Sequence, residues 1–351
     1  MSISDLYALG WDESWARWLA ESKFAQSAVG RVARMETSVV TLWGAGEPVL
    51  AQLPTRLKAP EDRPAVGDWV AYSGSASAKV RDVLPRRTIF ERRAAGRRTQ
   101  RQVVAANVDV VFIVSALDGD FNPRRIERYL AAVAQSGARP VVLLTKAAVL
   151  SEAQRDAVRS QSREVAGGAA VHLIDVVDGF ESGAASPYLT AGTTTALVGS
   201  SGVGKSTLLN HWAGEERQET RAVRARDGRG QHTTTRRELF VLDGGALVID
   251  TPGMRELALW ADVGALAEAF PDIAALAASC RFGDCRHGAE PGCAVRDALG
   301  GGSLDRARFE SFVALRREVE ATSAEVHAQR RRADARSGRL GRRPGSRARR
   351  R

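Results

Sequence analysis

The sequence predicts a multi-domain protein in which a small N-terminal β-barrel precedes a central α/β domain and a C-terminal α-helical region. Three observations predict this fold class. Short β-rich segments separated by Gly, Pro and Ser lie before residue 95, apolar strands alternate with helices between residues 103 and 260, and helical sequence containing a Cys/His cluster follows residue 261. The length of 351 residues is enough for about two or three such domains.

We expect five segments, whose boundaries follow changes in composition and periodicity. They are a helical extension over 1–26, a barrel of the oligonucleotide-binding type over 27–95, an α/β domain over 103–260, a helical domain over 261–328 and an Arg-rich disordered tail over 329–351.

The N-terminal extension has an aromatic stripe. Tyr7, Trp11, Trp15 and Trp18 recur at nearly helical spacing, which predicts one amphipathic helix over residues 1–22. We expect this helix to dock on the barrel, with base stacking as the alternative.

The barrel is predicted from four β-rich stretches, over 30–43, 48–53, 67–73 and 78–84. Seven arginines follow between residues 86 and 101, with only Glu91 opposing them. This stretch is interpreted either as a loop that contacts backbone phosphates or as a solvated linker.

The α/β domain is predicted from apolar runs typical of parallel strands buried on both faces. We expect helices over 123–136 and 151–165. We expect strands over 108–117, 140–146, 171–176, 196–198, 238–242 and 246–250.

A phosphate-binding loop lies at the centre of this domain. The stretch Gly199–Ser206 reads Gly-x-x-x-x-Gly-Lys-Ser, between an apolar strand and a helix that begins near Thr207. Its glycines let backbone N–H groups face a polyphosphate, Lys205 reaches the β- and γ-phosphates, and Ser206 is a ligand for Mg²⁺. The predicted contact residues are Gly199, Ser200, Ser201, Gly202, Val203, Gly204, Lys205, Ser206 and Thr207.

Three further stretches fit the same chemistry. Asp250-Thr251-Pro252-Gly253 ends a strand, where Asp250 can hold Mg²⁺ through water and the Gly253 N–H can sense a γ-phosphate. The loop from Gly228 to Thr235 contains Thr234, whose hydroxyl can complete the magnesium shell. Thr145-Lys146 ends a buried strand, where Lys146 can lie against a purine ring.

The order of these motifs, with the base-reading stretch before the phosphate loop, indicates a circularly permuted GTPase. The chain resembles the ribosome small-subunit-dependent GTPase A family over about residues 27 to 320. The matching stretches are Gly67–Val70, Pro85–Thr88, Ala105–Asp109, Asp120–Leu130, the phosphate loop, His232–Thr235, Asp250–Gly253 and the Cys/His loop. The resemblance implies a barrel, a permuted GTPase core and a zinc-containing C-terminal domain. It also implies binding to the small ribosomal subunit and its rRNA during late maturation, with subunit-stimulated hydrolysis of GTP to GDP.

The base-reading motif departs from the family's Asn/Thr-Lys-x-Asp. Here it reads Thr145-Lys146-Ala147-Ala148, so the carboxylate that pairs with guanine is missing. Glu152 is a candidate to replace it. The loop after the third strand reads Ile174-Asp175-Val176, where the family usually has small hydroxyl residues.

Catalysis must also draw on a different group from the glutamine of many GTPases. Met254 follows Gly253, and an apolar side chain cannot orient water. His232, with Lys205 and Thr234, forms our catalytic set, and the alternative is that His232 only stabilises its loop.

Cys280, Cys285, His287 and Cys293 have the spacing Cys-x4-Cys-x-His-x5-Cys. Three thiolates and one imidazole close a tetrahedral shell, which predicts one structural Zn²⁺. All three cysteines of the chain are used in this cluster, which excludes a disulfide framework.

Composition limits the partners. The net charge of +10 resides in the C-terminal arginines, which suits RNA, with a solubilising tail as the alternative. The sequence shows no secretory signal and no apolar run of bilayer length, so we expect a cytoplasmic protein with no membrane contact. Nothing in the sequence requires more than a monomer. Two other readings remain, an rRNA-binding assembly protein with a degenerate or base-relaxed nucleotide site and a P-loop kinase or ATPase.

Overall fold

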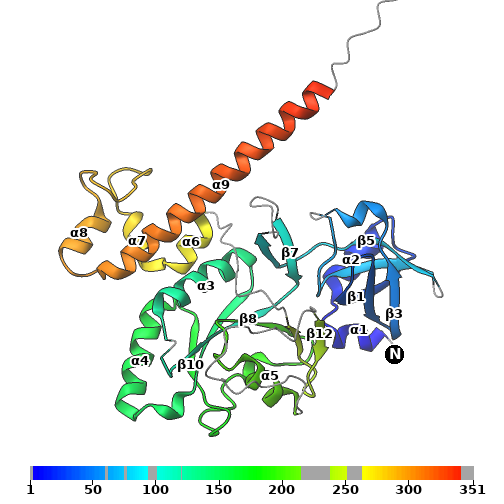
Figure 1. The fold of residues 1–351 in the computed structure, drawn as a ribbon, viewed down its shortest axis with the longest axis horizontal. Coiled ribbons are helices and arrows are strands. Elements are labelled where there is room, and N and C mark those ends of the chain that lie inside the picture. The colour runs from blue at the N-terminus through cyan, green and yellow to red at the C-terminus, as the bar shows by residue number, and fades with distance from the viewer. Residues whose placement is uncertain are drawn as a thin grey trace, which may run out of the picture.

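The computed structural model describes residues 3–59, 62–74, 77–93, 101–119, 121–214, 238–250 and 263–340 (Figure 1). The strands are β1 (Ala28–Met35), β2 (Val39–Gly44), β3 (Gly46–Gln52), β4 (Trp69–Ser73), β5 (Ala78–Val83), β6 (Ile89–Arg93), β7 (Arg101–Ala106), β8 (Val110–Ala116), β9 (Arg139–Thr145), β10 (Ala170–Leu173), β11 (Thr194–Val198), β12 (Glu238–Val241) and β13 (Leu247–Asp250). The α-helices are α1 (Ile3–Ala8), α2 (Glu13–Glu21), α3 (Pro123–Ser136), α4 (Glu152–Val165), α5 (Lys205–Ala213), α6 (Val263–Ala269), α7 (Pro271–Ala277), α8 (Ala294–Gly300) and α9 (Arg306–Leu340).

The central α/β part is built on a mostly parallel sheet with the order β10-β9-β8-β11-β13-β12. Strands β8, β9, β10, β11 and β13 run parallel, and β12 pairs antiparallel with β13. Parallel strands have their carboxyl ends on the same side of the sheet. The segments that follow β8, β9, β10, β11 and β13 therefore lie on that side.

The two faces of this sheet are covered by different helices (Figure 1). Val111 and Ile113 of β8 pack in one apolar cluster with Ile126 of α3. Phe112 and Val114, which alternate with them, pack in a second cluster with residues of α5. This alternation gives the strands the continuous apolar sequence expected of a doubly covered sheet.

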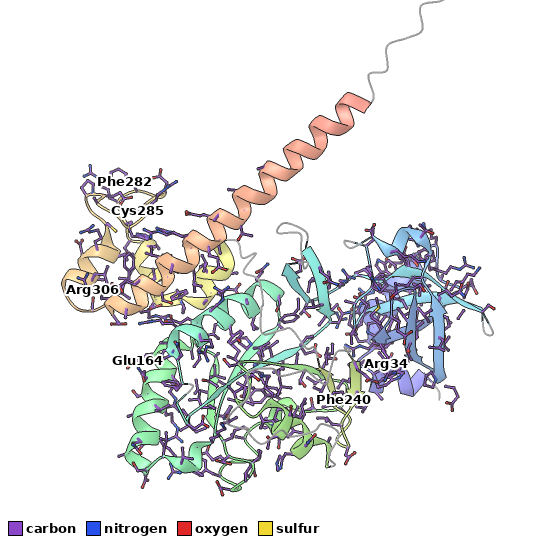
Figure 2. The ribbon with its side chains drawn as sticks, in the orientation of Figure 1. Arg34, Glu164, Phe240, Phe282, Cys285 and Arg306 are labelled. Atoms are coloured by element: carbon purple, nitrogen blue, oxygen red, sulfur yellow. The ribbon has the colours of Figure 1, made fainter. Side chains whose placement is uncertain are left out.

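The N-terminal barrel is closed by pairing of β1 with β4, in addition to the order β1-β2-β3-β5-β4. Its first strand also meets the α/β sheet, because Arg34 of β1 lies opposite Glu238 of β12 and forms an ion pair with it. Figure 2 labels Arg34 together with Phe240 of β12 at this junction. The two sheets are thus continuous through one pair of strands.

The N-terminal segment folds as two helices, and the prediction of one continuous helix is wrong. Gly10, at φ +84°, separates α1 from α2, and Asp12 caps α2 through its side chain. Trp11 and Trp15 pack against the fully buried Trp69 of the barrel, with centroid distances of 4.8 and 6.0 Å. The expected docking on the barrel is confirmed.

The described part of the Arg-rich stretch after the barrel contains two strands. Strands β6 and β7 form an antiparallel ribbon, and residues 94–100 between them lie outside the described residues. Arg86 forms a bidentate pair with the buried Asp68, at 2.8 and 2.7 Å. Arg87 lies 3.6 Å above the Trp15 ring. Arg86 therefore stabilises the barrel itself, and Arg87 holds the N-terminal helices against it.

A single buried arginine joins the barrel to its neighbours. Arg31 of β1 donates hydrogen bonds to the carbonyl oxygens of Leu9, Gly67 (3.2 Å) and Asn107 (3.0 Å). Its guanidinium also lies 5.6 Å from the Trp69 ring centroid. Burial lowers the pKa of Arg31 to about 10, so the group remains charged at neutral pH.

A charged network joins α3 to the C-terminal helices. Glu127, with a side chain 0% exposed, accepts from Arg308 of α9 at 2.9 Å and from Arg124 at 2.9 Å. Arg308 also forms a bidentate pair with Asp272 of α7, at 2.6 and 2.7 Å.

Helix α9 extends well beyond the body of the molecule (Figure 1). It continues to Leu340, so the prediction of disorder from residue 329 is wrong for 329–340. The last part of α9 is rich in alanine and arginine, which have high helix propensity. The helix can therefore continue past the residues that pack on the protein. In the described part of the chain, no helix has the length and apolar character needed to cross a membrane.

Candidate functional site

The phosphate loop connects β11 to α5. Gly199 has φ +144°, and a Cβ there would lie 2.2 Å from the carbonyl oxygen of Val114. Only glycine fits this close approach to β8. Gly202 and Gly204 also have positive φ, and Gly204 is the residue before the first turn of α5.

The side chains of the loop divide by exposure. Val203 is buried and anchors the loop, whereas Ser201 and Gly202 are exposed. Lys205 donates from Nζ to the carbonyl oxygen of Gly199 at 2.8 Å and also to that of Ser200. The ammonium group is therefore held at the loop backbone, and Ser206 and Thr207 follow it in the first turn of α5.

Arg125 of α3 reaches the same loop, and sequence reasoning missed this contact. Its guanidinium donates to Ser200 Oγ at 2.6 Å. No sequence motif links Arg125 to Ser200, which lies 75 residues later in the chain. Parallel pairing of β8 with β11 brings the segments after these strands together.

The stretch that the sequence predicts to read the base is attached directly to the predicted phosphate loop. Thr145, the last residue of β9, donates from Oγ1 to the carbonyl oxygen of Val203 at 2.7 Å. Lys146 has a left-handed backbone, φ +60°, and forms an ion pair with Asp118, which follows β8. Ala147 is buried, and Ala148 follows it in a short 3-10 turn.

An acid that sequence reasoning did not assign lies beside Ala148. Asp175 follows β10 and is buried, with 6% exposure. Its Oδ2 lies 3.4 Å from the backbone nitrogen of Ala148. Glu152, by contrast, is exposed in the first turn of α4. One signal in the sequence could have identified Asp175. Ala148 and Asp175 both depart from the family pattern, and they follow the strands β9 and β10.

Asp250 ends β13, which pairs in parallel with β11 in the register Ala196↔Ile249. The backbone of Asp250 therefore lies at the carboxyl end of β13, next to the carboxyl end of β11, where the phosphate loop begins. The remaining predicted residues, His232, Thr234 and Gly253, lie outside the described residues, so their roles stay predictions.

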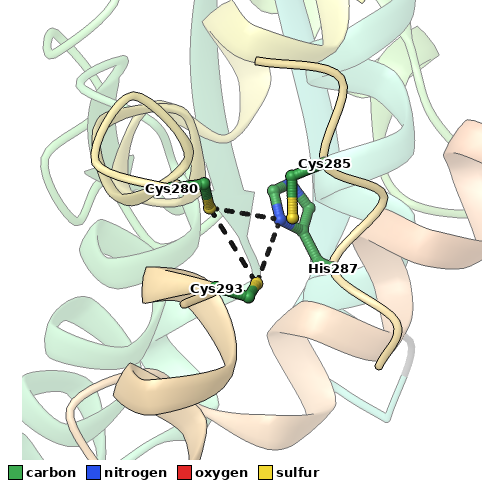
Figure 3. Close-up of side chains that lie close together, drawn as sticks. All are labelled: Cys280, Cys285, His287 and Cys293. Carbon is green, nitrogen blue, oxygen red and sulfur yellow. Dashed lines mark hydrogen bonds between the residues drawn. The ribbon is translucent and has the colours of Figure 1, made fainter. Parts of the chain in front are cut away.

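The Cys/His residues come together in the helical region (Figure 3). The ligand atoms of Cys280, Cys285, His287 and Cys293 all lie within 4.8 Å of one another. Cys280 Sγ is 3.9 Å from Cys293 Sγ, and His287 Nδ1 is 3.7 and 3.5 Å from these two sulfurs. Tetrahedral zinc with bonds of about 2.3 Å would place its sulfur ligands about 3.8 Å apart, so the donor set fits this metal.

The surroundings of the cluster favour metal binding. Burial lowers the pKa of His287, and the positive charge of Arg316 acts in the same direction. This keeps the imidazole neutral, which is the form that binds a metal. Cys280 follows α7 and Cys293 precedes α8, so a bound ion would tie these two short helices together.

Comparison with known proteins identifies the family. The sequence profile of the RsgA GTPase family matches residues 83–260. The chain belongs to the RsgA GTPase family. A relative from Opitutus terrae, named small ribosomal subunit biogenesis GTPase RsgA, is 46% identical over 329 residues, which cover 89% of each chain. Relatives of the same name from Xanthomonas axonopodis pv. citri and Syntrophotalea carbinolica are 48% and 42% identical, over 81% and 89% of this chain and 77% and 88% of theirs.

Solved structures share the fold. YjeQ from Thermotoga maritima superposes with a TM-score of 0.62 at 25% identity, covering 83% of this chain and 98% of that one. YloQ, described as a circularly permuted GTPase, superposes with a TM-score of 0.59 at 22% identity, covering 86% of this chain and 98% of that one. The fold predicted for this RsgA family member, with its barrel, permuted α/β core and helical Cys₃His region, is confirmed.

Proposed function

We propose that this chain is a GTPase that acts in biogenesis of the small ribosomal subunit, hydrolysing GTP to GDP and phosphate with stimulation by that subunit. Identity of 42–48% to relatives named for this activity supports the proposal. The observation that carries it is the hydrogen bond from Thr145 to Val203, which fixes a base-reading loop against a phosphate-binding loop.

Each loop has a defined task in nucleotide binding. Backbone N–H groups of Gly199–Thr207 would surround the phosphates, and the ammonium group of Lys205 would neutralise their charge. Thr145, Lys146, Ala147 and Ala148 would border the base. The hydroxyl groups of Ser206 and Thr234 and the carboxylate of Asp250 would hold Mg²⁺, which neutralises phosphate charge when bound. The end of β13 beside β11 supports this assignment for Asp250.

Hydrolysis needs a positioned water molecule and neutralised charge. We assign water positioning to His232, charge neutralisation to Lys205, and γ-phosphate sensing to Thr234 and Gly253. Helix α3 contacts both the phosphate loop, through Arg125, and helix α9, through the ion pair of Glu127 with Arg308. This gives the nucleotide site a physical connection to the C-terminal helices.

The other parts would hold RNA. We assign a structural Zn²⁺ to the Cys₃His cluster, because four protein ligands leave no open coordination position. The barrel of 27–95, the helical region of 261–328 and the Arg-rich C-terminus are the proposed rRNA contacts. A cytoplasmic monomer is the form that we propose, since the small subunit matures there.

The proposal is tested by measuring phosphate release from GTP and from ATP, with and without purified small subunits. We expect strong subunit stimulation with GTP alone. Lys205→Ala should lower stimulated turnover at least about 100-fold, because an uncompensated phosphate charge raises the barrier. His232→Ala should lower turnover while leaving nucleotide affinity unchanged.

Lys23→Ala, which removes a lysine distant in sequence from both loops, is the matched control and should retain turnover. Binding of GTP without turnover would contradict the proposal in favour of an assembly protein with a degenerate site. Hydrolysis of ATP without subunits would contradict it in favour of an ATPase.

A further inference from the structure

Guanine presents two adjacent donors, its N1–H and its exocyclic 2-amino group, and a carboxylate can accept from both. Adenine presents an acceptor at N1, which a carboxylate repels. Selection of guanine over adenine therefore calls for an acid at the base-binding loops. Ala148 cannot supply it, and the inference below rests on the GTPase activity proposed above.

The base-binding loops are formed by two neighbouring strands. Strands β9 and β10 run parallel in the register Leu144↔Leu173, so residues 145–148 and 174–178 begin side by side. Backbone bonds join the two loops, from Ile174 N–H to the Leu144 carbonyl at 2.8 Å and from Ala147 N–H to the Ile174 carbonyl at 3.3 Å. A side chain on the second loop can therefore occupy the space beside the first.

Asp175 is placed in this way. Its Oδ1 accepts from the backbone N–H groups of Val177 at 3.1 Å and Asp178 at 3.3 Å, which fixes the carboxylate on its own loop. Its Oδ2 faces the other loop, 3.4 Å from the nitrogen of Ala148. The carboxylate thus lies beside the residue at which the family carries its acid.

The partners of Asp175 leave it with acceptor capacity. A carboxylate has about four lone-pair sites, and the contacts to Ala148, Val177 and Asp178 are single N–H groups at 3.1 to 3.4 Å. Within the described ranges, no lysine or arginine forms an ion pair with Asp175, although it is buried. A buried carboxylate without a cation is stabilised by further donors, and the two guanine donors are of that kind.

We propose that Asp175 reads the guanine base, so that the acid of the base-binding site comes from the loop after β10 instead of from position 148. The small Ala148 leaves room for this carboxylate. Asp175 accepts from guanine N1–H and the 2-amino group, while Thr145 keeps the base loop in register with the phosphate loop.

The test uses Asp175→Asn in the full-length protein, with GDP, ADP and xanthosine diphosphate measured by titration calorimetry. Asparagine retains an oxygen for Val177 and Asp178 but presents an amide group in place of the second acceptor. We expect GDP affinity to fall at least about 100-fold, because each of the two charge-assisted hydrogen bonds is worth a factor of about 10 or more. We expect affinity for xanthosine diphosphate to rise, because its 2-carbonyl accepts from the new amide.

Asp178→Asn is the matched control, since it removes the same charge from an exposed position on the same loop. We expect it to leave the affinities for all three nucleotides unchanged. A second variant, Asp175→Ser combined with Ala148→Asp, returns the acid to the usual loop and should restore GDP affinity to within a few-fold of the parent protein.

Unchanged GDP affinity in Asp175→Asn, or equal losses for GDP and ADP with no gain for xanthosine diphosphate, would overturn the assignment. So would failure of the double variant to recover while Asp175→Ser alone remains folded by circular dichroism. If the parent protein hydrolyses GTP with subunits but Asp175→Asn keeps its base preference, only this inference fails. If the parent binds GDP no better than ADP, the proposed function fails as well.

Discussion

Arg31 and Arg308 are both buried arginines at a junction between parts of the molecule, but their partners differ in charge. Arg31 joins the barrel, the N-terminal segment and the α/β part through three carbonyl oxygens. Arg308 joins α3 to the C-terminal helices through two carboxylates, Glu127 and Asp272.

The difference predicts how each junction can be broken. Removing Arg31 leaves neutral carbonyl groups without a donor, whereas removing Arg308 leaves the buried Glu127 with less of the positive charge that compensates it. The second loss is larger. The charged junction should also respond to acid, because its carboxylates lose their charge when they are protonated.

The largest effect is expected for Arg308→Met. Methionine keeps apolar contact with Phe270, above which Arg308 now lies at 4.8 Å, but Glu127 is left with Arg124 alone. Unfolding free energy should fall by about 3 to 5 kcal/mol, measured by urea denaturation of the zinc-loaded protein.

Arg306→Met, an exposed change on the same helix, is the control and should stay within about 0.5 kcal/mol of the parent. Adding Glu127→Leu to Arg308→Met should recover most of the loss, since the buried carboxylate that kept Arg124 but lost Arg308 is then gone. No recovery would mean that packing, and not charge, dominates this junction.

A smaller effect is expected for Arg31→Met. The carbonyl groups of Leu9, Gly67 and Asn107 lose a donor, which should cost about 2 to 3 kcal/mol. The free energy of unfolding is to be measured by urea denaturation followed by tryptophan fluorescence, because Trp69 lies beside the guanidinium of Arg31. Arg17→Met, at an exposed position of α2, is the control and should leave the free energy of unfolding nearly unchanged. A loss for Arg31→Met as large as that for Arg308→Met would remove the distinction between the junctions.

The smallest effect concerns pH. Burial raises the pKa of Asp272, but hydrogen bonds and charge from Arg308 outweigh it, so the pKa lies below its ordinary value of 3.8. A lowered pKa contributes stability above pH 3.8 that is lost as pH falls through the folded-state pKa. Because Asp272 is 41% exposed, solvent screening limits this to below about 1 kcal/mol.

Unfolding of the parent and of Asp272→Asn is to be compared between about pH 3 and 6. The difference between the two should shrink as the pH falls. Both proteins share the metal ligands, so acid effects on the Cys/His cluster cancel in the comparison. A difference that stays constant across this range would show that the ionised form of Asp272 contributes nothing.

Local rules predicted much of the fold. Helix α3 runs from Pro123 to Ser136, with Gly137 at φ +81° after it, close to the residues at which the sequence places proline and glycine signals. The zinc cluster could be predicted because its four ligands, Cys280, Cys285, His287 and Cys293, are close together in the sequence. The phosphate loop depends on contiguous residues too.

Features that depend on distant partners were not predicted. The β6–β7 ribbon is rich in arginine and lacks the apolar alternation that marks a strand. The neighbourhood of Asp175 and Ala148 exists only because β9 and β10 pair. The break at Gly10 lies inside an aromatic stripe whose spacing continues across it, so periodicity alone could not detect it.

The bridge between Arg34 and Glu238 has a consequence for how the protein can be dissected. Beyond β12 the α/β sheet has a free edge, and β1 pairs with the first residue of β12, Glu238. Open strand edges recruit other chains into mixed aggregates. In a fragment that begins after the barrel, this pairing with β1 would be lost, and we expect the free edge at β12 to make the α/β fragment more prone to self-association than the full chain.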